Sequence, residues 1–282
     1  MKYQKMNNLI KIYGKDDFCP KHIFECGQVF LYDQNSDGDY EISSDGKNAV
    51  VIEREDGYDI ITKHVDYFEN YFDLQTDYLA IKSNLALIDG FKKYIDFGHG
   101  IRILNQNILE TIIGFVLSQN NNISRIKQTM QRICKDFHAQ GKNTSLVFPS
   151  LDLLCGADEE YFKSIGAGYR ARYLVDTISA LREKGIENVA RLTTVELEQF
   201  LLSIRGIGRK VADCILLFAF KRSDSFPVDT WVDRACCDLF GKTFSSRLQI
   251  RTEMMQHFGS LSGYAQQYLF YYYRENKFKT TR

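Results

Sequence analysis

The chain has few of the features that mark exported, membrane-bound or metal-holding proteins. Its seven cysteines include no Cys-x-x-Cys pair, which argues against a zinc or iron–sulfur site, and their odd number predicts reduced thiols. The first residues contain no apolar stretch of signal-peptide length, and nowhere do about 18 apolar residues follow one another. These absences predict a cytoplasmic protein with no membrane span.

Net charge is also lacking, because 36 Lys and Arg residues balance 36 Asp and Glu residues. The balance hides two regions of opposite sign: residues 1–100 carry −7, and residues 101–282 carry +7. A basic half favours a polyanion such as nucleic acid as partner, although a solvated charged surface explains many such imbalances. Charge alone therefore leaves nucleic acid binding open.

Short strands are predicted over residues 23–63. The runs IFECGQVFLY, DYEIS, NAVVIERE and YDIITK are separated by turn residues, which include Asp45-Gly46 and Asp56-Gly57. Asp-Gly pairs between alternating runs indicate antiparallel hairpins. Gly27 interrupts the first run, and a glycine inside a strand indicates either a bulge or the close approach of another group to the backbone.

After about residue 100 the apolar residues recur with the period of a helix. Residues 107–119 are apolar on nearly every side, which predicts a helix buried in the middle of a bundle. Residues 122–141 predict an amphipathic helix, with Asn122 as its N-cap and Gly141 at its end.

A capping-box pattern, Thr193 with Glu196, precedes another amphipathic helix over residues 195–204. The predicted fold class is therefore α+β. We expect an N-terminal antiparallel sheet domain over residues 1–100, followed by an all-helical domain over residues 101–282.

The stretch SIRGIGRKVADC, residues 203–214, predicts a helix-hairpin-helix over residues 197–220. Gly206 and Gly208 permit a tight turn between the two helices and a close approach by another molecule. The turn leaves backbone N–H groups at the start of the second helix free to bind a phosphate, which favours contact with a nucleic acid backbone. The alternative is a purely structural turn.

Two ionisable residues accompany this hairpin. Lys210 lies beside Arg205 and Arg209 at the start of the second helix, and these charges with the helix dipole predict a lowered pKa and a nucleophilic neutral amine. A phosphate-binding lysine is the alternative. Asp229 precedes a further amphipathic helix, where its carboxylate caps the helix and stays ionised. An anchored anion beside an amine suits a reaction that develops positive charge on a sugar, although an ordinary N-cap also explains Asp229.

These residues resemble a known family. The hairpin, Lys210 and residues 227–229 (PVD) are similar to the helix-hairpin-helix, Gly/Pro-Asp (HhH-GPD) superfamily of DNA glycosylases. Five segments also resemble, in content and order, the 8-oxoguanine DNA glycosylase/AP lyases of that superfamily: CGQVF, SQNNNISRI, GAGYRARY, IGRKVADC with PVD, and YAQQYLF. The absence of a C-terminal four-cysteine cluster argues against the iron–sulfur branch of the superfamily.

The resemblance implies an enzyme that flips 8-oxoguanine out of double-stranded DNA and excises it. Lys210 would attack C1′ and form a Schiff base, which permits β-elimination at the abasic site, and Asp229 would stabilise the developing oxocarbenium charge. No cofactor and no metal site are predicted, although a monovalent cation is possible at the hairpin carbonyls of Leu202, Ile204 and Ile207. The expected protein is a cytoplasmic monomer, associated with the nucleoid through DNA.

The resemblance also implies a base pocket. Gly27 would present its carbonyl to N7–H of 8-oxoguanine, a proton that guanine lacks. Gln266 would read the Watson–Crick edge, Phe270 would stack on the ring, and Cys214 would line its other side. From the residues alone, Gln266 and Phe270 form a core stripe at helical spacing and Cys214 is a packing residue.

Opposite the lesion, the resemblance assigns four residues to the vacated stack and the orphaned base: Asn120, Arg125, Tyr169 and Arg170. Arginine donors suit the acceptors of cytosine, which predicts a preference for 8-oxoguanine paired with cytosine. A phosphate contact is the alternative for each arginine.

Two positions depart from the family pattern. A histidine often stands two residues after the aspartate, with an acidic partner just past the aromatic of the last helix, whereas this chain has Trp231 and Tyr273. Because both positions differ together, we expect that Trp231 and Tyr273 stand in place of an interacting histidine–acid pair.

Three other functions stay open: a glycosylase for another damaged base, a non-catalytic helix-hairpin-helix DNA-binding module, and a protein-interaction domain, which the basic region disfavours.

Overall fold

The computed structural model describes residues 1–137 and 147–276. An antiparallel sheet comes first, with strand order β1-β2-β6-β5-β4-β3. Its strands are β1 (Lys2–Met6), β2 (Leu9–Tyr13), β3 (Tyr32–Gln34), β4 (Tyr40–Ser44), β5 (Lys47–Arg54) and β6 (Gly57–Ile61). Asp45 and Gly46 have positive φ values of 49° and 72° between β4 and β5, so the predicted tight hairpin is confirmed. In the second predicted turn, Asp56-Gly57, the glycine is not a turn residue: Gly57 pairs with Arg54 and begins β6.

The first predicted strand is wrong. Residues 20–24 form a short helix, α1 (Pro20–Phe24), and Gly27 lies in the loop that follows, with φ of +79°. The buried Gln28 side chain explains the difference, because it donates to Ile23 O and accepts from Leu104 N, each at 2.9 Å. A side chain, rather than a neighbouring strand, therefore satisfies these backbone groups.

Helices make up most of the remaining structure. Three precede residue 100 and were not predicted: α2 (Val65–Tyr71), α3 (Tyr78–Leu85) and α4 (Lys92–Phe97). The others are α5 (Ile108–Leu117), α6 (Ile123–Phe137), α7 (Leu151–Leu154), α8 (Glu159–Ser164), α9 (Arg170–Lys184), α10 (Ile186–Ala190), α11 (Thr194–Ser203), α12 (Arg209–Phe218), α13 (Thr230–Phe240), α14 (Arg247–Phe258) and α15 (Ser262–Asn276). The α+β class, with the sheet before the helical region, is confirmed.

The local helix signals are also confirmed. Helix α5 is buried on nearly every side, and the capping box of Thr193 and Glu196 begins α11. The Asn122 side chain accepts a backbone N–H at the start of α6 (2.9 Å), whereas the predicted end at Gly141 lies outside the described residues. Within the described part of the chain, each helix is too short or too polar to cross a bilayer.

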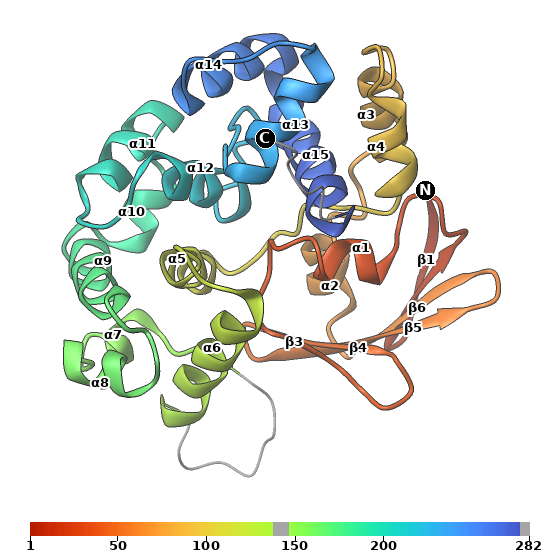
Figure 1. The fold of residues 1–282 in the computed structure, drawn as a ribbon. Helices are drawn as coiled ribbons and strands as arrows, with labels where there is room; N and C mark the ends of the chain where they lie inside the picture. The colour runs from red at the N-terminus through yellow and green to blue at the C-terminus, as the bar shows by residue number, and fades with distance from the viewer. Residues whose placement is uncertain (138–146, 277–282) are drawn as a thin grey trace.

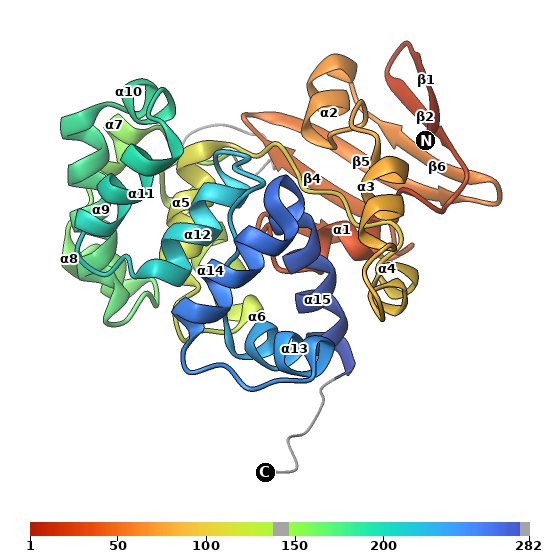
Figure 2. The ribbon, with the colours of Figure 1, turned by 90° about the horizontal axis from the view of Figure 1, so that it is seen from above.

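The last helix connects the two parts of the molecule. The sheet with α1 and α2 lies on one side, and the helices from α5 to α11 curve around the other (Figure 1). Helix α15 runs between them and packs against α13 and α4 (Figure 2). Its Gln267 Nε2 donates to Cys26 O at 2.9 Å. The junction therefore draws on residues far apart in the sequence.

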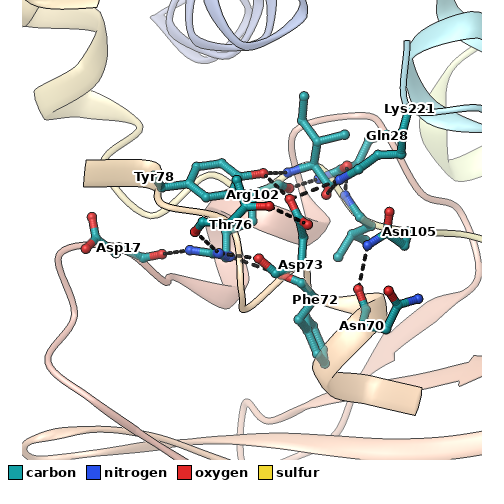
Figure 3. Close-up of polar contacts among 12 residues, drawn as sticks. Asp17, Gln28, Asn70, Phe72, Asp73, Thr76, Tyr78, Arg102, Asn105 and Lys221 are labelled. Atoms are coloured by element: carbon teal, nitrogen blue, oxygen red, sulfur yellow. Dashed lines mark hydrogen bonds and ion pairs between the residues drawn. The ribbon is translucent and has the colours of Figure 1, made fainter. Parts of the chain in front are cut away.

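A buried arginine holds the loops that border the sheet (Figure 3). The Arg102 side chain is fully buried, and its Cζ lies 4.0 Å from the centroid of the Tyr78 ring. Its guanidinium donates to four backbone carbonyls, those of Asp17, Phe72, Asp73 and Thr76. Lys221, just past α12, pairs with Asp73 at 3.0 Å. This cluster connects the helical region to the loops beside the sheet.

A buried carboxyl group lies at the start of α5. Glu110 is 6% exposed, and its Oε2 has no hydrogen-bond partner among the described residues. Burial, with a smaller contribution from the negative charge of Asp45, raises the pKa of Glu110 to about 8. The folded protein therefore holds this proton at pH values where the unfolded chain has lost it.

Replacing Glu110 by glutamine is expected to remove a pH-dependent loss of stability. As pH rises from the ordinary carboxyl pKa of 4.5 towards 8, the unfolded chain releases the proton and the folded protein keeps it, so wild-type stability falls. The stability difference between E110Q and wild type should grow by about 3 kcal/mol between pH 5 and pH 8. Urea unfolding of both proteins at both pH values measures this stability difference. The same difference at pH 5 and pH 8 would contradict a raised pKa for Glu110.

Candidate active site

A small cavity at the junction gathers residues from five parts of the chain. Its lining consists of Cys26, Gly27, Phe115, Lys210, Cys214, Phe218, Pro227, Asp229, Gln266, Gln267 and Phe270. All six residues predicted for catalysis and base binding are among them. The cavity measures about 40 Å³, room for about three water molecules and much less than a purine base needs. A base therefore enters only if the lining moves.

The helix-hairpin-helix lies beside this cavity, as its sequence predicts. Helix α11 ends at Ser203 and α12 begins at Arg209. Gly206 has φ of +88°, and a Cβ there would lie 2.2 Å from the Tyr173 ring, so the turn requires glycine. Gly208 is the N-cap of α12 and provides no side-chain cap. The first N–H groups of α12 therefore have no capping side chain and remain available to an anion.

The pKa of Lys210 differs from its prediction. Burial disfavours the ammonium form, but the neighbouring Cys214 sulfur, which also accepts a hydrogen bond, and the negative charge of Asp229 outweigh burial, so the pKa of Lys210 is raised. The predicted lowering is wrong because the charges of the two arginines are offset: Arg209 pairs with Glu198 at 2.9 Å, and Arg205 is exposed to solvent. Lys210 is therefore an ammonium at neutral pH and must release a proton before Nζ can attack carbon.

Asp229 is the N-cap of α13, as predicted. Its Oδ1 accepts hydrogen bonds from Trp231 N and Val232 N, both at 2.9 Å. The cap uses one carboxylate oxygen and fixes the side chain at a helix N-terminus, where an anion is stabilised. Because Asp229 lines the cavity with Lys210, its charge lies beside the amine.

Helix α15 and the second turn of α12 supply the other walls. Gln266 is 5% exposed, and its Oε1 has no hydrogen-bond partner among the described residues. A buried acceptor without a partner is costly, and a bound N–H donor would satisfy it. Cys214 is buried one turn after Lys210, and burial raises its pKa to about 11, so it is a neutral thiol. Phe270 is partly exposed at the edge of the cavity.

Two family models together match most of the chain. Residues 12–112 match the N-terminal domain of 8-oxoguanine DNA glycosylase, and residues 113–259 match HhH-GPD superfamily base excision DNA repair proteins. The chain belongs to this HhH-GPD superfamily. The two matches meet inside α5, whereas the sequence predicted a boundary at residue 100.

Individual relatives of the HhH-GPD protein agree with this assignment. An 8-oxoguanine glycosylase/lyase of Clostridium acetobutylicum, solved with DNA containing cytosine opposite 8-oxoguanine, is 34% identical, with a TM-score of 0.90 over 98% of this chain and 99% of that one. N-glycosylase/DNA lyase OGG1 of Arabidopsis thaliana is 34% identical over 69% of this chain and 60% of its own length. The N-glycosylase/DNA lyase of Saccharomyces cerevisiae is 29% identical over 78% and 68%. The predicted family, the 8-oxoguanine glycosylase/lyases, is confirmed.

Three of the four residues assigned to the opposite strand lie together, since hydrogen bonds join Tyr169 and Arg170 to the loop that carries Asn120. The Arg170 guanidinium is buried and donates to Asn120 O at 2.6 Å and to Gln119 O. The Tyr169 hydroxyl also donates to Gln119 O (3.2 Å), and its side chain is 55% exposed. Arg125 is exposed, and its guanidinium has no partner among the described residues. Arg170 thus braces the loop that carries Asn120, and its guanidinium is occupied by backbone carbonyls, whereas the Arg125 guanidinium is exposed.

A second cavity, of about 280 Å³, lies on another side of Lys210 and is rich in arginine. Its lining consists of Arg209, Lys210, Asp213, Val228, Arg247, Leu248 and Arg251. Arg251 pairs with the buried Asp213 at 2.8 Å and with Glu198 at 2.9 Å. Burial raises the pKa of Asp213 to about 6 although Arg251 opposes this. Sequence reasoning missed this pair because its members are 38 residues apart.

The two positions that depart from the family pattern lie on packed helices. Trp231 is in α13 and Tyr273 in α15, and both belong to one apolar cluster. The Tyr273 hydroxyl donates to Asp238 Oδ2 at 2.7 Å, and Arg234 lies 5.4 Å over the Trp231 ring. The two residues thus face the same core, and their origin as a replaced pair stays a prediction.

Proposed function

We propose that the protein flips 8-oxoguanine out of duplex DNA, excises it through Lys210 and cleaves the strand at the resulting abasic site. The supporting observation is that one cavity holds an amine, a fixed carboxylate and the unpartnered amide oxygen of Gln266. An amine beside an anion suits covalent attack on a sugar carbon, and a buried free acceptor suits the N–H edge of a purine.

The chemistry follows from the positions of Lys210 and Asp229. The Lys210 ammonium first gives its extra proton to water, and the neutral Nζ then bonds to C1′ while the C1′–N9 bond breaks. The base leaves with the electron pair of that bond and takes up the proton that the attacking amine loses. The Asp229 carboxylate stabilises the positive charge that develops on the sugar. Opening of the sugar ring gives a Schiff base, loss of a C2′ proton expels the 3′ phosphate, and water releases the lysine.

Base recognition uses the remaining walls. The Gly27 carbonyl accepts from N7–H of 8-oxoguanine, and the same carbonyl repels the bare N7 of guanine. Gln266 Oε1 accepts from the Watson–Crick edge, and Phe270 stacks on the ring after moving outward from its position in the small cavity.

The direct test is covalent trapping with sodium borohydride. A duplex with one 8-oxoguanine opposite cytosine should give a stable adduct with the wild-type protein, and the same duplex with guanine should give none, because only the Schiff base is reduced. Base release without an adduct would contradict the lysine route. Binding without either product would favour a non-catalytic module, and activity only on another lesion would favour the alternative glycosylase.

The exposed Arg125 guanidinium should set the preference for the opposite base. Bidentate donation to an orphaned cytosine is worth ~1–3 kcal/mol, so excision opposite cytosine should exceed excision opposite adenine by about tenfold. Arg125→Ala should remove most of this difference, and Arg182→Ala, at the exposed end of α9, is the control. Single-turnover rates opposite all four bases measure it. An equal loss opposite every base would instead identify a phosphate contact.

Other predictions stay proposals. We infer a monomer that acts in the cytoplasm, bound to the nucleoid through DNA, and that needs no cofactor. A monovalent cation at the carbonyls of Leu202, Ile204 and Ile207 also stays a proposal. Ile204 O already accepts from Ile207 N at 3.1 Å, so a cation there would share this oxygen with the turn.

A further inference from the structure

The backbone carbonyls around Gly27 differ in whether they accept a hydrogen bond from a side chain. Three accept side-chain hydrogen bonds: Glu25 O from Arg274 Nη2, Cys26 O from Gln267 Nε2 at 2.9 Å, and Gln28 O from Gln106 Nε2 at 2.9 Å. In the part of the chain that the structure describes, the Gly27 carbonyl accepts none. A free carbonyl is thus flanked on both sides by carbonyls that are held.

Two of these donors belong to the helix that lines the cavity. Gln267 and Arg274 are seven residues apart in α15, about two turns, and therefore lie on one face. Gln266 and Phe270, on the same helix, line the cavity. One rigid element therefore fixes the loop and also presents the residues that meet the base.

Packing and burial hold the loop further. A Cβ at Gly27 would lie 3.1 Å from Arg274 Nη1 and 3.2 Å from Phe270 Cε1, so the Gly27 backbone rests against both side chains. On the far side, Gln28 Nε2 donates to Arg102 O at 2.7 Å. Gln28 and Arg102 are both fully buried, which connects the loop to the arginine cluster of Figure 3.

We propose that Gln267 and Arg274 are positioning residues that set the base specificity of the enzyme. They hold the backbone before Gly27 so that its carbonyl stays directed at the atom that distinguishes the bases. A fixed acceptor gains a hydrogen bond from a purine with a protonated N7 and meets an unpaired nitrogen in guanine. A loose acceptor turns away from guanine at little cost and also loses the hydrogen bond to the lesion. The inference rests on the proposed function.

The test measures discrimination rather than activity. In a Lys210→Gln background, the dissociation constants for duplexes with 8-oxoguanine or guanine opposite cytosine are compared, before and after adding Gln267→Met and Arg274→Met. Methionine keeps most of the side-chain volume and removes the donors. The ratio of the two constants should fall by about tenfold in the double replacement, as expected when one hydrogen bond is misaligned. Arg274→Lys, which keeps a donor, should restore part of the ratio.

Arg54→Met is the matched control, because Arg54 lies on β5 and pairs with Asp59 at 2.7 Å, away from the cavity lining. If the methionine variants fail to fold, the same ratio is measured with Gln267→Asn. Asparagine keeps the amide group, but its side chain is one methylene shorter, so the donor no longer reaches the Cys26 carbonyl. An equal loss of affinity for both duplexes, with the ratio unchanged, would overturn the inference and leave a merely structural role. A wild type without preference for 8-oxoguanine would overturn the proposed function itself, and the inference with it.

Discussion

Replacement of Lys210 by glutamine is expected to abolish both base release and the borohydride-trapped adduct. Glutamine has no amine to bond to C1′, and removing a catalytic nucleophile lowers rates by about 10⁴-fold or more. The partly buried side chain keeps a similar length, so the cavity lined by Asp229 and Gln266 should persist. Single-turnover excision from a duplex with 8-oxoguanine opposite cytosine measures the loss.

Binding separates this result from misfolding. K210Q should bind the 8-oxoguanine duplex about as well as the wild type, because Gly27, Gln266 and Phe270 are unchanged. Asp229→Asn is the informative companion: it keeps a capping oxygen for α13 and removes the charge, and its rate should fall by about 10²- to 10³-fold while the adduct still forms. Base release by K210Q at the wild-type rate would exclude Lys210 as nucleophile.

Replacement of Arg102 by methionine is expected to destabilise the protein strongly. The change leaves the four carbonyls held by Arg102 without their donor, and each buried unsatisfied group costs ~1–3 kcal/mol. A loss of at least about 4 kcal/mol is a large fraction of the stability of an ordinary domain, ~5–15 kcal/mol. Arg102→Lys should also be strongly destabilising, because a single ammonium group cannot reach all four carbonyls.

Urea unfolding of the variant beside wild type measures this loss. Arg54→Met, which removes a half-exposed arginine from the sheet, is the control and should change stability by less than about 1 kcal/mol. If the free energy of unfolding of R102M lay within about 1 kcal/mol of the wild-type value, water would have to replace the guanidinium at these carbonyls, and the cluster in Figure 3 would not anchor the loops.

The elements that the sequence predicts correctly are those with a local cause. The Asp45-Gly46 turn needs two residues with positive φ, and the cap of α11 needs only Thr193 and Glu196. The predicted strand through Gly27 fails because its partners are distant: Gln28 satisfies Leu104, 76 residues away. An apolar run of that length fits a strand or a buried helix and loop equally well.

The same distinction holds within the site. Lys210 and Asp229 stand in local motifs, so spacing and resemblance find them. Gln267 and Arg274 act on carbonyls 241 and 249 residues away, and no pattern in the sequence marks such contacts. The predicted direction of the Lys210 pKa shift is wrong because sequence proximity to Arg209 does not reveal that the Arg209 guanidinium pairs with Glu198.

The position of α15 also has a consequence for synthesis of the protein. Lys210 and the hairpin leave the ribosome before α15 does, yet the walls of the cavity include Gln266 and Phe270. A nascent chain that has reached the hairpin therefore has neither Gln266 nor Phe270 beside Lys210, and Cys26 still lacks its partner Gln267. The cavity beside Lys210 is therefore complete only when α15 docks against a loop that lies 241 residues earlier in the chain.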